Sequence, residues 1–496
     1  MELFGETVSV GSAVFLFLAL FLALSFEFVN GFHDTANAVA TVIYTHSLKA
    51  TYAVVWSGVW NLIGVLTSSG AVAYSIVSLL PVELVLNVGS GAGFAMVFSL
   101  LLAAIIWNLG TWYLGIPASS SHTLVGSIMG VGLANSLVTP GHVFGEGVNW
   151  AKAADVFKSL LFSPIFGFFA AALLLWLCKI IIKNKELYHP PEPGKAPPWW
   201  IRGILIFTCT GVSFAHGSND GQKGMGLIVL ILVGILPGAF ALNPAAGPDD
   251  LQSIVNETKI IQPYLDKQAP LMQVSGQDAI DEMSDYMKPT GKSTIRLWDS
   301  LAGMNRQIGQ ELTGKTGFHD LTSEQRKDIR RDIYLYSESM LKLIKKKEVE
   351  DPTEAKAMSS LAKKMNAETK YIPTWVKFAV AIALGLGTMI GWKRIVVTVG
   401  EKIGKTHLTY AQGASAEIVA MGTILTADQL GLPVSTTHIL SSGIAGTMWA
   451  NKSGLQGDTI RSILLAWVLT LPVCVLLGSA LFAGSFYILF HLFGVK

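Results

Sequence analysis

The sequence predicts an all-α polytopic membrane protein that consists of two inverted repeats with broken or re-entrant helices and a soluble helical insertion in the second half. Three observations lead to this prediction. Of the 496 residues, 51% are hydrophobic and only 14% are charged. Residues 241–371 alone hold 19 of the 36 Lys and Arg and 20 of the 34 Asp and Glu. Two motifs also occur twice. Such a composition is typical of a membrane protein with one soluble insertion rather than of a soluble globular protein.

Apolar segments of about membrane-spanning length follow one another along the chain, and about ten spans are expected. The first segment, 10–29, lacks the basic flank of a signal peptide and is predicted to remain in the protein. The basic residues form no stripe, so nucleic acid is not an expected partner. The candidate segments are 10–29, 50–78, 91–113, 155–182, 200–215 continuing into 221–241, 373–392, 410–428 and 461–492.

The first duplicated motif is GFHDTANA at 31–38, which matches GSNDGQKG at 217–224 with an offset of 186. The matching pairs are Gly31 with Gly217, Asp34 with Asp220, and Asn37 with Lys223. Both copies follow one apolar run and precede another. This arrangement indicates that the two segments occupy equivalent places in two halves of the protein.

The second duplicated motif is GIPASSSHTLVGSIMG at 115–130, which matches GLPVSTTHILSSGIAG at 431–446 with an offset of 316. The two offsets differ by the length of the charged insertion. The predicted parts are a first repeat 1–190, a second repeat 200–240 with 372–496, and a soluble insertion 241–371. Such duplication is typical of transporters whose site lies where the repeats meet.

Loop charges predict that the two repeats have opposite orientations in the membrane. Loops 179–202 and 393–405 carry several Lys and Arg, which favour the cytoplasmic side. The segment 79–90, taken as the counterpart of the second loop, carries only Glu83. Opposite charge at equivalent positions is what inverted repeats produce.

The motifs predict helix breaks that bind an anion. Asn30 and Gly31 favour a break, after which a half-helix begins, and 217–224 is expected to do the same. Pro117 and Pro433 suit the first turn of a helix. Four half-helix N-termini and neutral hydroxyls would form a cage for a tetrahedral oxyanion, although Ser and Thr runs also serve as contacts between membrane helices. The hydroxyls are those of Ser119, Ser120, Ser121, Ser435, Thr436 and Thr437.

Asp34 and Asp220 are carboxylates in apolar surroundings, and such residues are candidates for function. Beside an anion they would be repulsive unless a cation lies between, which favours cation-coupled symport by a bound cation or a proton. Asn37 offers an amide oxygen of the kind that hard cations accept. Lys223 could replace a bound cation, neutralise Asp220 or contact the anion. A plain salt bridge to Asp220 is the alternative.

Two further carboxyls are candidates for a proton relay. Glu27 lies seven residues before Asp34, on the same face of a continuous helix, and Glu417 lies in a later apolar segment. Ordinary hydrogen-bonded carboxyls remain the alternative. His33, His122 and His438 are expected to organise loops rather than to bind metal, and the sequence identifies no metal site.

The insertion shows apolar residues at helical spacing, which predicts at least two amphipathic helices. One set begins at Ile295 and ends at Leu312, and the other begins at Ile329 and ends at Ile344. Thr322 or Ser323 is the expected cap of the second helix. No catalytic pattern occurs here, so a packing or assembly role is expected.

Outside the insertion, the chain resembles the inorganic phosphate transporter (Pit) family. That family carries a duplicated G-x-N-D-x-x-N-A motif and a duplicated G-[LI]-P-x-S-[ST]-[ST]-H motif. The corresponding segments here are 31–38, 217–224, 115–122 and 431–438. The segments FHDTANAVATVIYT and AHGSNDGQKG are similar to those of the bacterial low-affinity, proton-coupled branch of the family.

The resemblance implies a symporter of the bacterial inner membrane that carries phosphate as a neutral divalent metal–phosphate complex with protons. It implies contacts of phosphate with Asp34, Asn37, Asp220 and the hydroxyl triplets 119–121 and 435–437. It also implies a homodimer and no bound cofactor. Sodium-coupled phosphate symport and sulfate transport are the alternatives within the family. His33 and Lys223 replace the usual Asn residues, and Lys223 favours protons over sodium.

A hydrolase and an anion channel or sensor are the alternatives to a transporter. A hydrolase could use Ser121, His122 and an Asp, but a catalytic triad has no need to occur twice, so an enzyme is not expected. An anion channel or a sensor, with the insertion as its effector module, would not need two buried carboxylates. Asp34→Asn separates the classes, because a coupled carrier should lose accumulation whereas a channel could still leak anion.

Overall fold

The computed structural model describes residues 2–80, 90–139, 143–146, 148–192, 194–269, 274, 276–288 and 291–488, without the side chains of 34–37. The chain divides into two compact units. Unit 1 comprises residues 1–17, 81–93 and 229–373, and unit 2 comprises 18–80, 94–228 and 374–496. The predicted boundaries of the repeats and of the insertion remain predictions.

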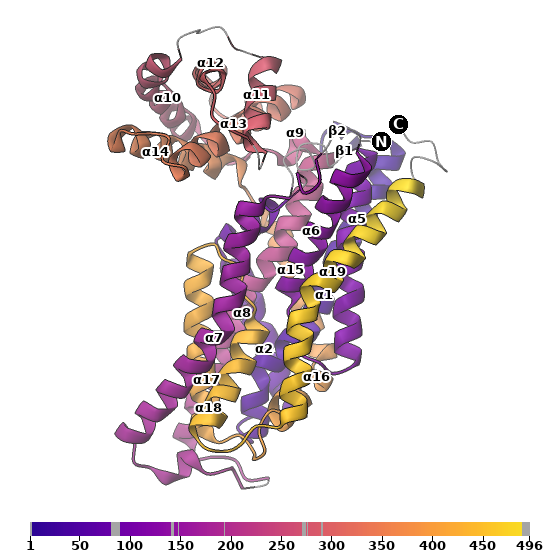
Figure 1. The fold of residues 1–496 in the computed structure, drawn as a ribbon, viewed down its shortest axis with the longest axis vertical. Helices are drawn as coiled ribbons and strands as arrows, with labels where there is room; N and C mark the ends of the chain where they lie inside the picture. The colour runs from indigo at the N-terminus through magenta and orange to yellow at the C-terminus, as the bar shows by residue number, and fades with distance from the viewer. Residues whose placement is uncertain are drawn as a thin grey trace. The chain divides into compact units, whose positions relative to one another are not determined.

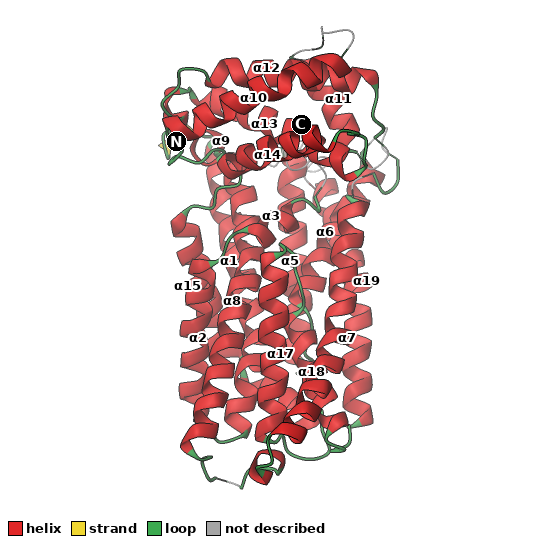
Figure 2. Ribbon diagram, turned by 90° about the vertical axis from the view of Figure 1, so that its left-hand side faces the viewer, coloured by secondary structure: helices red, strands yellow, loops and turns green. Residues whose placement is uncertain are grey.

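Unit 2 is a bundle of long helices (Figure 1), and loops lie mainly at the helix ends (Figure 2). Among the described residues, six helices are long and apolar enough to cross a membrane, namely α1, α2, α5, α7, α15 and α19. They confirm the predicted multi-pass membrane protein. The elements that lie mostly in unit 2 are α1 (Val10–Tyr44), α2 (Ala50–Thr67), α3 (Ala71–Val77), α5 (Gly91–Tyr113), α6 (Ser120–Val138), α7 (Trp150–Ile181), η1 (Lys185–Tyr188), α8 (Trp199–Ile235), α15 (Thr374–Gly391), α16 (Lys393–Val397), η3 (Thr398–Lys402), α17 (Tyr410–Gln429), α18 (Thr436–Ala450) and α19 (Gly457–Tyr487).

Unit 1 contains the helices of the insertion and a short N-terminal hairpin of two antiparallel strands. The helix predicted from Ile295 to Leu312 is confirmed as α12, and the helix predicted over Ile329–Ile344 is confirmed as part of α13. Thr322 is the N-cap of α13 and forms a capping box with Gln325. The elements are β1 (Glu2–Leu3), β2 (Glu6–Thr7), α9 (Pro237–Phe240), α10 (Pro248–Gln268), α11 (Gln277–Met287), α12 (Ile295–Leu312), η2 (Phe318–Asp320), α13 (Ser323–Lys345) and α14 (Pro352–Thr369).

The predicted breaks at Asn30–Gly31 and within 217–224 are wrong, because α1 and α8 are continuous through both segments. The glycines serve close packing between helices instead. A methyl group on Gly31 would lie 2.5 Å from the carbonyl oxygen of Leu384 in α15, and one on Gly217 would lie 2.1 Å from that of Asn61 in α2. Small residues of this kind allow two membrane helices to approach closely.

The second motif pair does begin helices. Ser119 caps α6 by accepting a hydrogen bond from the His122 amide, and Ser435 caps α18 in the same way. The prediction that Pro117 and Pro433 occupy the first turn is wrong, because each lies two residues before the cap. The predicted cage of four helix N-termini is therefore reduced to two.

Helices α1 and α8 run in opposite directions where they pack. Glu27 of α1 approaches Gly224 of α8, whereas Thr41 and Thr208 both contact Glu417 of α17. Residue numbers therefore rise along α1 while they fall along α8. Two equivalent helices in opposite orientations are what inverted repeats would produce, and the inversion of the complete halves remains a prediction.

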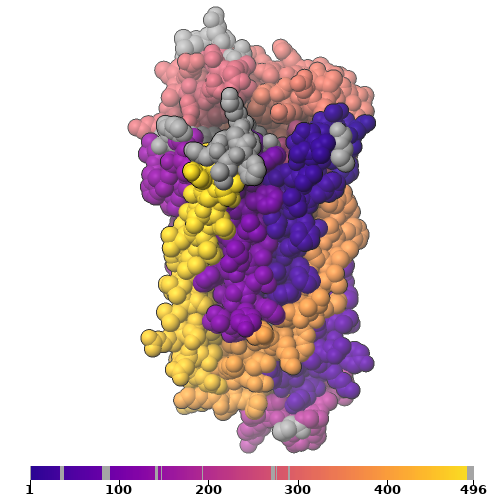
Figure 3. All heavy atoms as spheres, turned by 90° about the vertical axis from the view of Figure 1, so that its right-hand side faces the viewer, coloured from indigo at the N-terminus to yellow at the C-terminus, as the bar shows by residue number. Residues whose placement is uncertain are grey.

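Helix α5 lies between α1 and α19 on one face of unit 2 (Figure 3). It contacts α1 through Asn108, whose carbonyl oxygen lies 2.8 Å from Nε2 of His33. It contacts α19 through Trp107, whose indole donates to Thr470 at 3.0 Å. The predicted role of His33 in local organisation fits this contact, which joins two helices rather than a loop.

Candidate functional site

A buried ion pair lies on α8 within the second copy of the first motif. Nζ of Lys223 is 2.8 Å from Oδ2 of Asp220, and both side chains are 0% exposed. Lys223 also donates to the hydroxyl of Ser120 at 3.2 Å. The hydroxyl of Thr436 donates to Oδ2 of Asp220 at 3.5 Å. The pair therefore brings together α8 and the first residues of both α6 and α18.

The hydroxyls of each triplet have different roles. Ser119 and Ser435 cap their helices, and Ser121 donates to the carbonyl oxygen of Val434 at 2.7 Å. The middle residues, Ser120 and Thr436, are the ones that contact the ion pair. Thr437 is buried. Ser120 and Thr436 thus meet at the ion pair, whereas Ser119, Ser121 and Ser435 have structural partners.

Asp34 and Asn37 lie in the part of α1 whose side chains are not described, so their predicted contacts remain predictions. The course of the backbone still places them. Along the chain, Asp34 is seven residues after Glu27 and seven before Thr41. The contacts of Glu27 and Thr41 therefore lie on either side of Asp34 along α1.

Glu27 is fully buried on one side of Asp34 along α1. Its carboxylate accepts a hydrogen bond from Nδ2 of Asn30 at 3.3 Å. Its Cγ would be 2.3 Å from a methyl group on Gly224, so only glycine fits there. Gly224 directly follows Lys223. The predicted relay residue thus lies beside the segment that carries the ion pair.

Glu417 is fully buried beside Thr41, on the other side of Asp34 along α1. The hydroxyls of Thr41 and Thr208 both donate to its carboxylate. Thr41 follows Glu27 by 14 residues, which corresponds to about 21 Å along a helix. The two predicted relay carboxyls therefore lie at different depths, and the side-chain hydrogen-bond donors of each are neutral, although Glu27 also interacts with the charge of Lys223.

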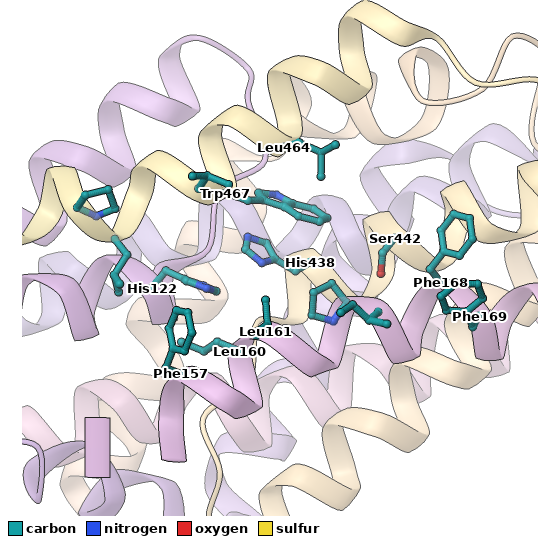
Figure 4. Close-up of a pocket in the computed structure, with 15 residues that line it drawn as sticks. His122, Phe157, Leu160, Leu161, Phe168, Phe169, His438, Ser442, Leu464 and Trp467 are labelled. Atoms are coloured by element: carbon teal, nitrogen blue, oxygen red, sulfur yellow. The ribbon is translucent and has the colours of Figure 1, made fainter. Parts of the chain in front are cut away.

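His122 and His438 follow the two hydroxyl triplets and lie against each other, with ring centroids 4.7 Å apart. His438 also stacks on Trp467 at 4.0 Å. These rings line a cavity of about 510 Å³ among otherwise mostly apolar side chains of α7, α18 and α19 (Figure 4). This cavity, lined mostly by apolar side chains, therefore lies beside the N-terminal ends of α6 and α18, which carry the hydroxyl triplets.

The arrangement does not form the hydrolase site considered above. Ser121 donates to the Val434 carbonyl group, and His122 lies against His438. Among the side chains that the structure describes, no three or more His, Cys, Asp or Glu residues are placed to hold a metal ion.

One buried carboxylate was missed by the sequence reasoning. Asp428, in the last turn of α17, accepts hydrogen bonds from Ser218 at 2.7 Å and from Gln222 at 2.5 Å. Both donors lie on α8, more than 200 residues earlier in the chain. The available signal was an Asp at the end of an apolar segment, three residues before Gly431 of the second copy of the second motif.

Known proteins resemble the chain over nearly all of its length. The model of the phosphate transporter family matches residues 30–478. The low-affinity inorganic phosphate transporter PitA of Escherichia coli K12 is 43% identical over 95% of this chain and 96% of its own. PitB of the same organism is 40% identical over 96% and 97%. A probable low-affinity inorganic phosphate transporter of Bacillus subtilis is 28% identical over 93% and 94%.

The fold is also found in a solved structure. A sodium-dependent phosphate transporter matches 95% of this chain and 98% of its own, with a TM-score of 0.52 and 21% identity. At that identity the match shows a shared fold. The family match and the relatives go further and confirm the resemblance drawn from the motifs. The chain belongs to the phosphate transporter family, whose members are transporters rather than enzymes.

Proposed function

We propose that the protein is a secondary symporter that imports inorganic phosphate across the inner membrane together with protons. The observation that carries this proposal is the buried Asp220–Lys223 pair, which contacts Ser120 and Thr436. An anion at this place meets one ammonium, one carboxylate and neutral hydroxyls. The ammonium and the hydroxyls can donate hydrogen bonds to phosphate, and the carboxylate opposes its binding, so phosphate can be both bound and released. The names of PitA and PitB support phosphate as the anion.

Protons are favoured over sodium because of Lys223. In the first repeat the matching residue is Asn37, whose amide oxygen could coordinate a cation. In the second repeat an ammonium lies 2.8 Å from the Asp220 carboxylate. It occupies the position from which a bound sodium ion would neutralise that carboxylate. The second repeat therefore carries a permanent cation where a sodium-coupled carrier needs an exchangeable one.

Glu27 and Glu417 are proposed as the two proton-carrying groups of the path. Each is a buried carboxyl whose side-chain hydrogen-bond donors are neutral, and intramembrane carboxyls of this kind are typical of proton relays. They contact α1 on either side of Asp34 along the helix, Glu27 as one of its own residues and Glu417 through Thr41. In this proposal Glu27 exchanges protons beside the ion pair, whereas Glu417 does so at the depth of Thr41 and Thr208.

The transported form is proposed to be a neutral complex of phosphate with a divalent metal such as magnesium, which enters as substrate. Charge neutralisation lowers the cost of moving phosphate through an apolar protein interior. The homodimer expected from the family resemblance remains a prediction.

Uptake of labelled phosphate into proteoliposomes tests the proposal. We would impose an inward proton gradient or an inward sodium gradient, each with and without magnesium. The proposal expects accumulation that follows the proton gradient and requires magnesium. A dependence on sodium would contradict the role given to Lys223. Uptake of sulfate without uptake of phosphate would retain the transporter but replace its substrate.

A further inference from the structure

Asp428 is a buried carboxylate to which the proposed transport cycle assigns no role, because proton transfer there is assigned to Glu27 and Glu417. It lies in the last turn of α17 and is 5% exposed. Its hydrogen-bond donors are the hydroxyl of Ser218 at 2.7 Å and the amide of Gln222 at 2.5 Å. Within the described part of the chain, no Lys, Arg or His lies within ion-pair distance of its oxygens. Its surroundings therefore hold a carboxylate by neutral groups alone.

Two opposing influences act on this carboxyl group. Burial and the negative end of the α17 dipole favour a bound proton, whereas the two donors favour the carboxylate form. The titratable residues of α8 near its donors are His216, Asp220 and Lys223, of which the last two form the ion pair. Helix α3, which Gln222 also contacts, contributes Tyr74 as its titratable residue.

Gln222 connects Asp428 to a third helix. Its Oε1 accepts hydrogen bonds from the amides of Val72 at 2.9 Å and Ala73 at 3.4 Å in α3. Its Nε2 donates both to Asp428 and to the carbonyl oxygen of Ser218. One side chain thus joins α3, α8 and α17, and its place in the chain is directly before Lys223.

The segment after Asp428 leads straight to the candidate site. Asn219 donates to the carbonyl oxygen of Leu432 at 3.3 Å, and Ser121 donates to that of Val434 at 2.7 Å. The next residue is the cap Ser435, followed by Thr436, which contacts Asp220. Asp428 therefore lies at one end of a short, hydrogen-bonded loop whose other end is the hydroxyl triplet.

We propose that Asp428 is a further proton-binding site, and that its protonation releases the contacts that hold the α17–α18 loop against α8. The inference rests on the proposed function. A proton taken from water converts Oδ1 from a carboxylate oxygen into a hydroxyl, which is a donor and a weaker acceptor. The Gln222 amide is itself a donor, so that hydrogen bond is weakened. Loss of the proton restores the contact, so proton binding is linked to the position of Ser435 and Thr436.

The test compares two assays of the reconstituted full-length protein. Net phosphate uptake driven by a proton gradient requires proton release and binding in each cycle, whereas phosphate–phosphate exchange at equal pH does not. We would measure both for the wild type, Asp428→Asn and Asp428→Glu, with thermal unfolding as a control for folding. Asp428→Asn imitates the protonated state, and Asp428→Glu retains a titratable group.

The expected result is a split between the two assays. For Asp428→Asn, net uptake should fall by about tenfold or more while exchange changes by less than about threefold. Asp428→Glu should restore net uptake and its dependence on pH. If Asp428→Asn keeps the wild-type pH profile and accumulation, the proposal is wrong. An equal loss of both assays in both variants would mean that Asp428 only supports the fold.

Ser218→Ala keeps the test decisive if Asp428→Asn does not fold. It retains the carboxylate but removes one donor to its charged form. The pH midpoint of net uptake should therefore move upward by about one unit. An unchanged midpoint would contradict the proposal. Wild-type phosphate uptake that ignores protons would overturn the proposed function and this inference together, whereas normal wild-type coupling with unchanged variants would overturn only the inference.

Discussion

The two copies of each duplicated motif share the residues that build the helical frame and the carboxyl pair Asp34 and Asp220, and they differ in the other residues that handle charge. Gly31 and Gly217 each pack against the backbone of another helix, and Ser119 and Ser435 each cap a helix. The unmatched positions are Glu27 with Ser213, Ala36 with Gln222, Asn37 with Lys223, Leu101 with Glu417, and Trp112 with Asp428.

This difference teaches that the matched positions keep the helix packing and the caps, whereas these further charged residues occur in one copy only. In the second repeat Lys223 neutralises Asp220, and Gln222 contacts Asp428. At the place matching Asp428, Trp112 instead donates its indole N–H to the Gly391 carbonyl group at 2.6 Å. Shared residues should therefore show similar effects in both repeats, and unmatched residues should show effects with no counterpart.

The largest expected effect is that of Lys223→Gln. Removal of one partner of a buried ion pair leaves an uncompensated charge and costs about 3–5 kcal/mol. Proton-driven uptake and the midpoint of thermal unfolding should both fall strongly. The double variant Asp220→Asn/Lys223→Gln should recover much of the stability but not the transport. A stable single variant would mean that Asp220 does not depend on the lysine.

The next largest effect is a loss of stability that should be similar for matching glycines in the two motif copies. Gly31→Ala and Gly217→Ala place a methyl group within 2.5 Å of a carbonyl oxygen in a neighbouring helix, which costs about 1–3 kcal/mol through overpacking. Gly203→Ala is the matched control in α8, because a methyl group there has no atom within 4 Å. Denaturation of the purified protein measures all three. Tolerance of Gly217→Ala would argue against the packing role.

The insertion offers a charged residue outside the membrane-spanning segments. Burial raises the pKa of Asp332 to about 6, although the nearby Arg331 guanidinium lowers it. The folded state therefore favours the protonated form, and this stability is lost as pH rises through about 6. Asp332→Asn should stabilise α12 and α13 by roughly 1–2 kcal/mol at pH 8 relative to pH 5.

Hydrogen exchange of α12 and α13 in the full-length protein would measure this effect. Asp328→Asn is the control, because Asp328 is about half exposed and pairs with the same arginine, Arg331. Equal gains at both pH values, or an equal response of the control, would contradict the assigned cause.

The smallest effect is the loss of a helix cap, and it should be similar in the two copies of the second motif. Ser119→Ala and Ser435→Ala each remove a helix cap, which costs about 1 kcal/mol. The corresponding Thr variants should be nearly neutral, because they retain the hydroxyl. Thermal unfolding in detergent measures the stability of all four variants. A much larger loss of transport for one Ala variant would show that this hydroxyl also serves the substrate.

The sequence by itself determined the class of the protein, the duplication and the presence of helices in the insertion. These properties depend on composition and on spacing along the chain. Apolar length indicates a span, helical spacing indicates an amphipathic helix, and a Thr three residues before a Gln predicts the cap at Thr322. The Asp220–Lys223 pair was also accessible, because residues three apart lie on one helix face.

Only the tertiary structure decided how the motifs are used. Gly31 and Asn30 are compatible with a helix break or with close packing, and the nearby backbone of α15 selects packing. The contacts of Asp428 and Glu417 join helices that are about 200 or more residues apart in the chain. Their physical reason is that a buried carboxyl needs donors, and only the arrangement of the helices determines which side chains supply them.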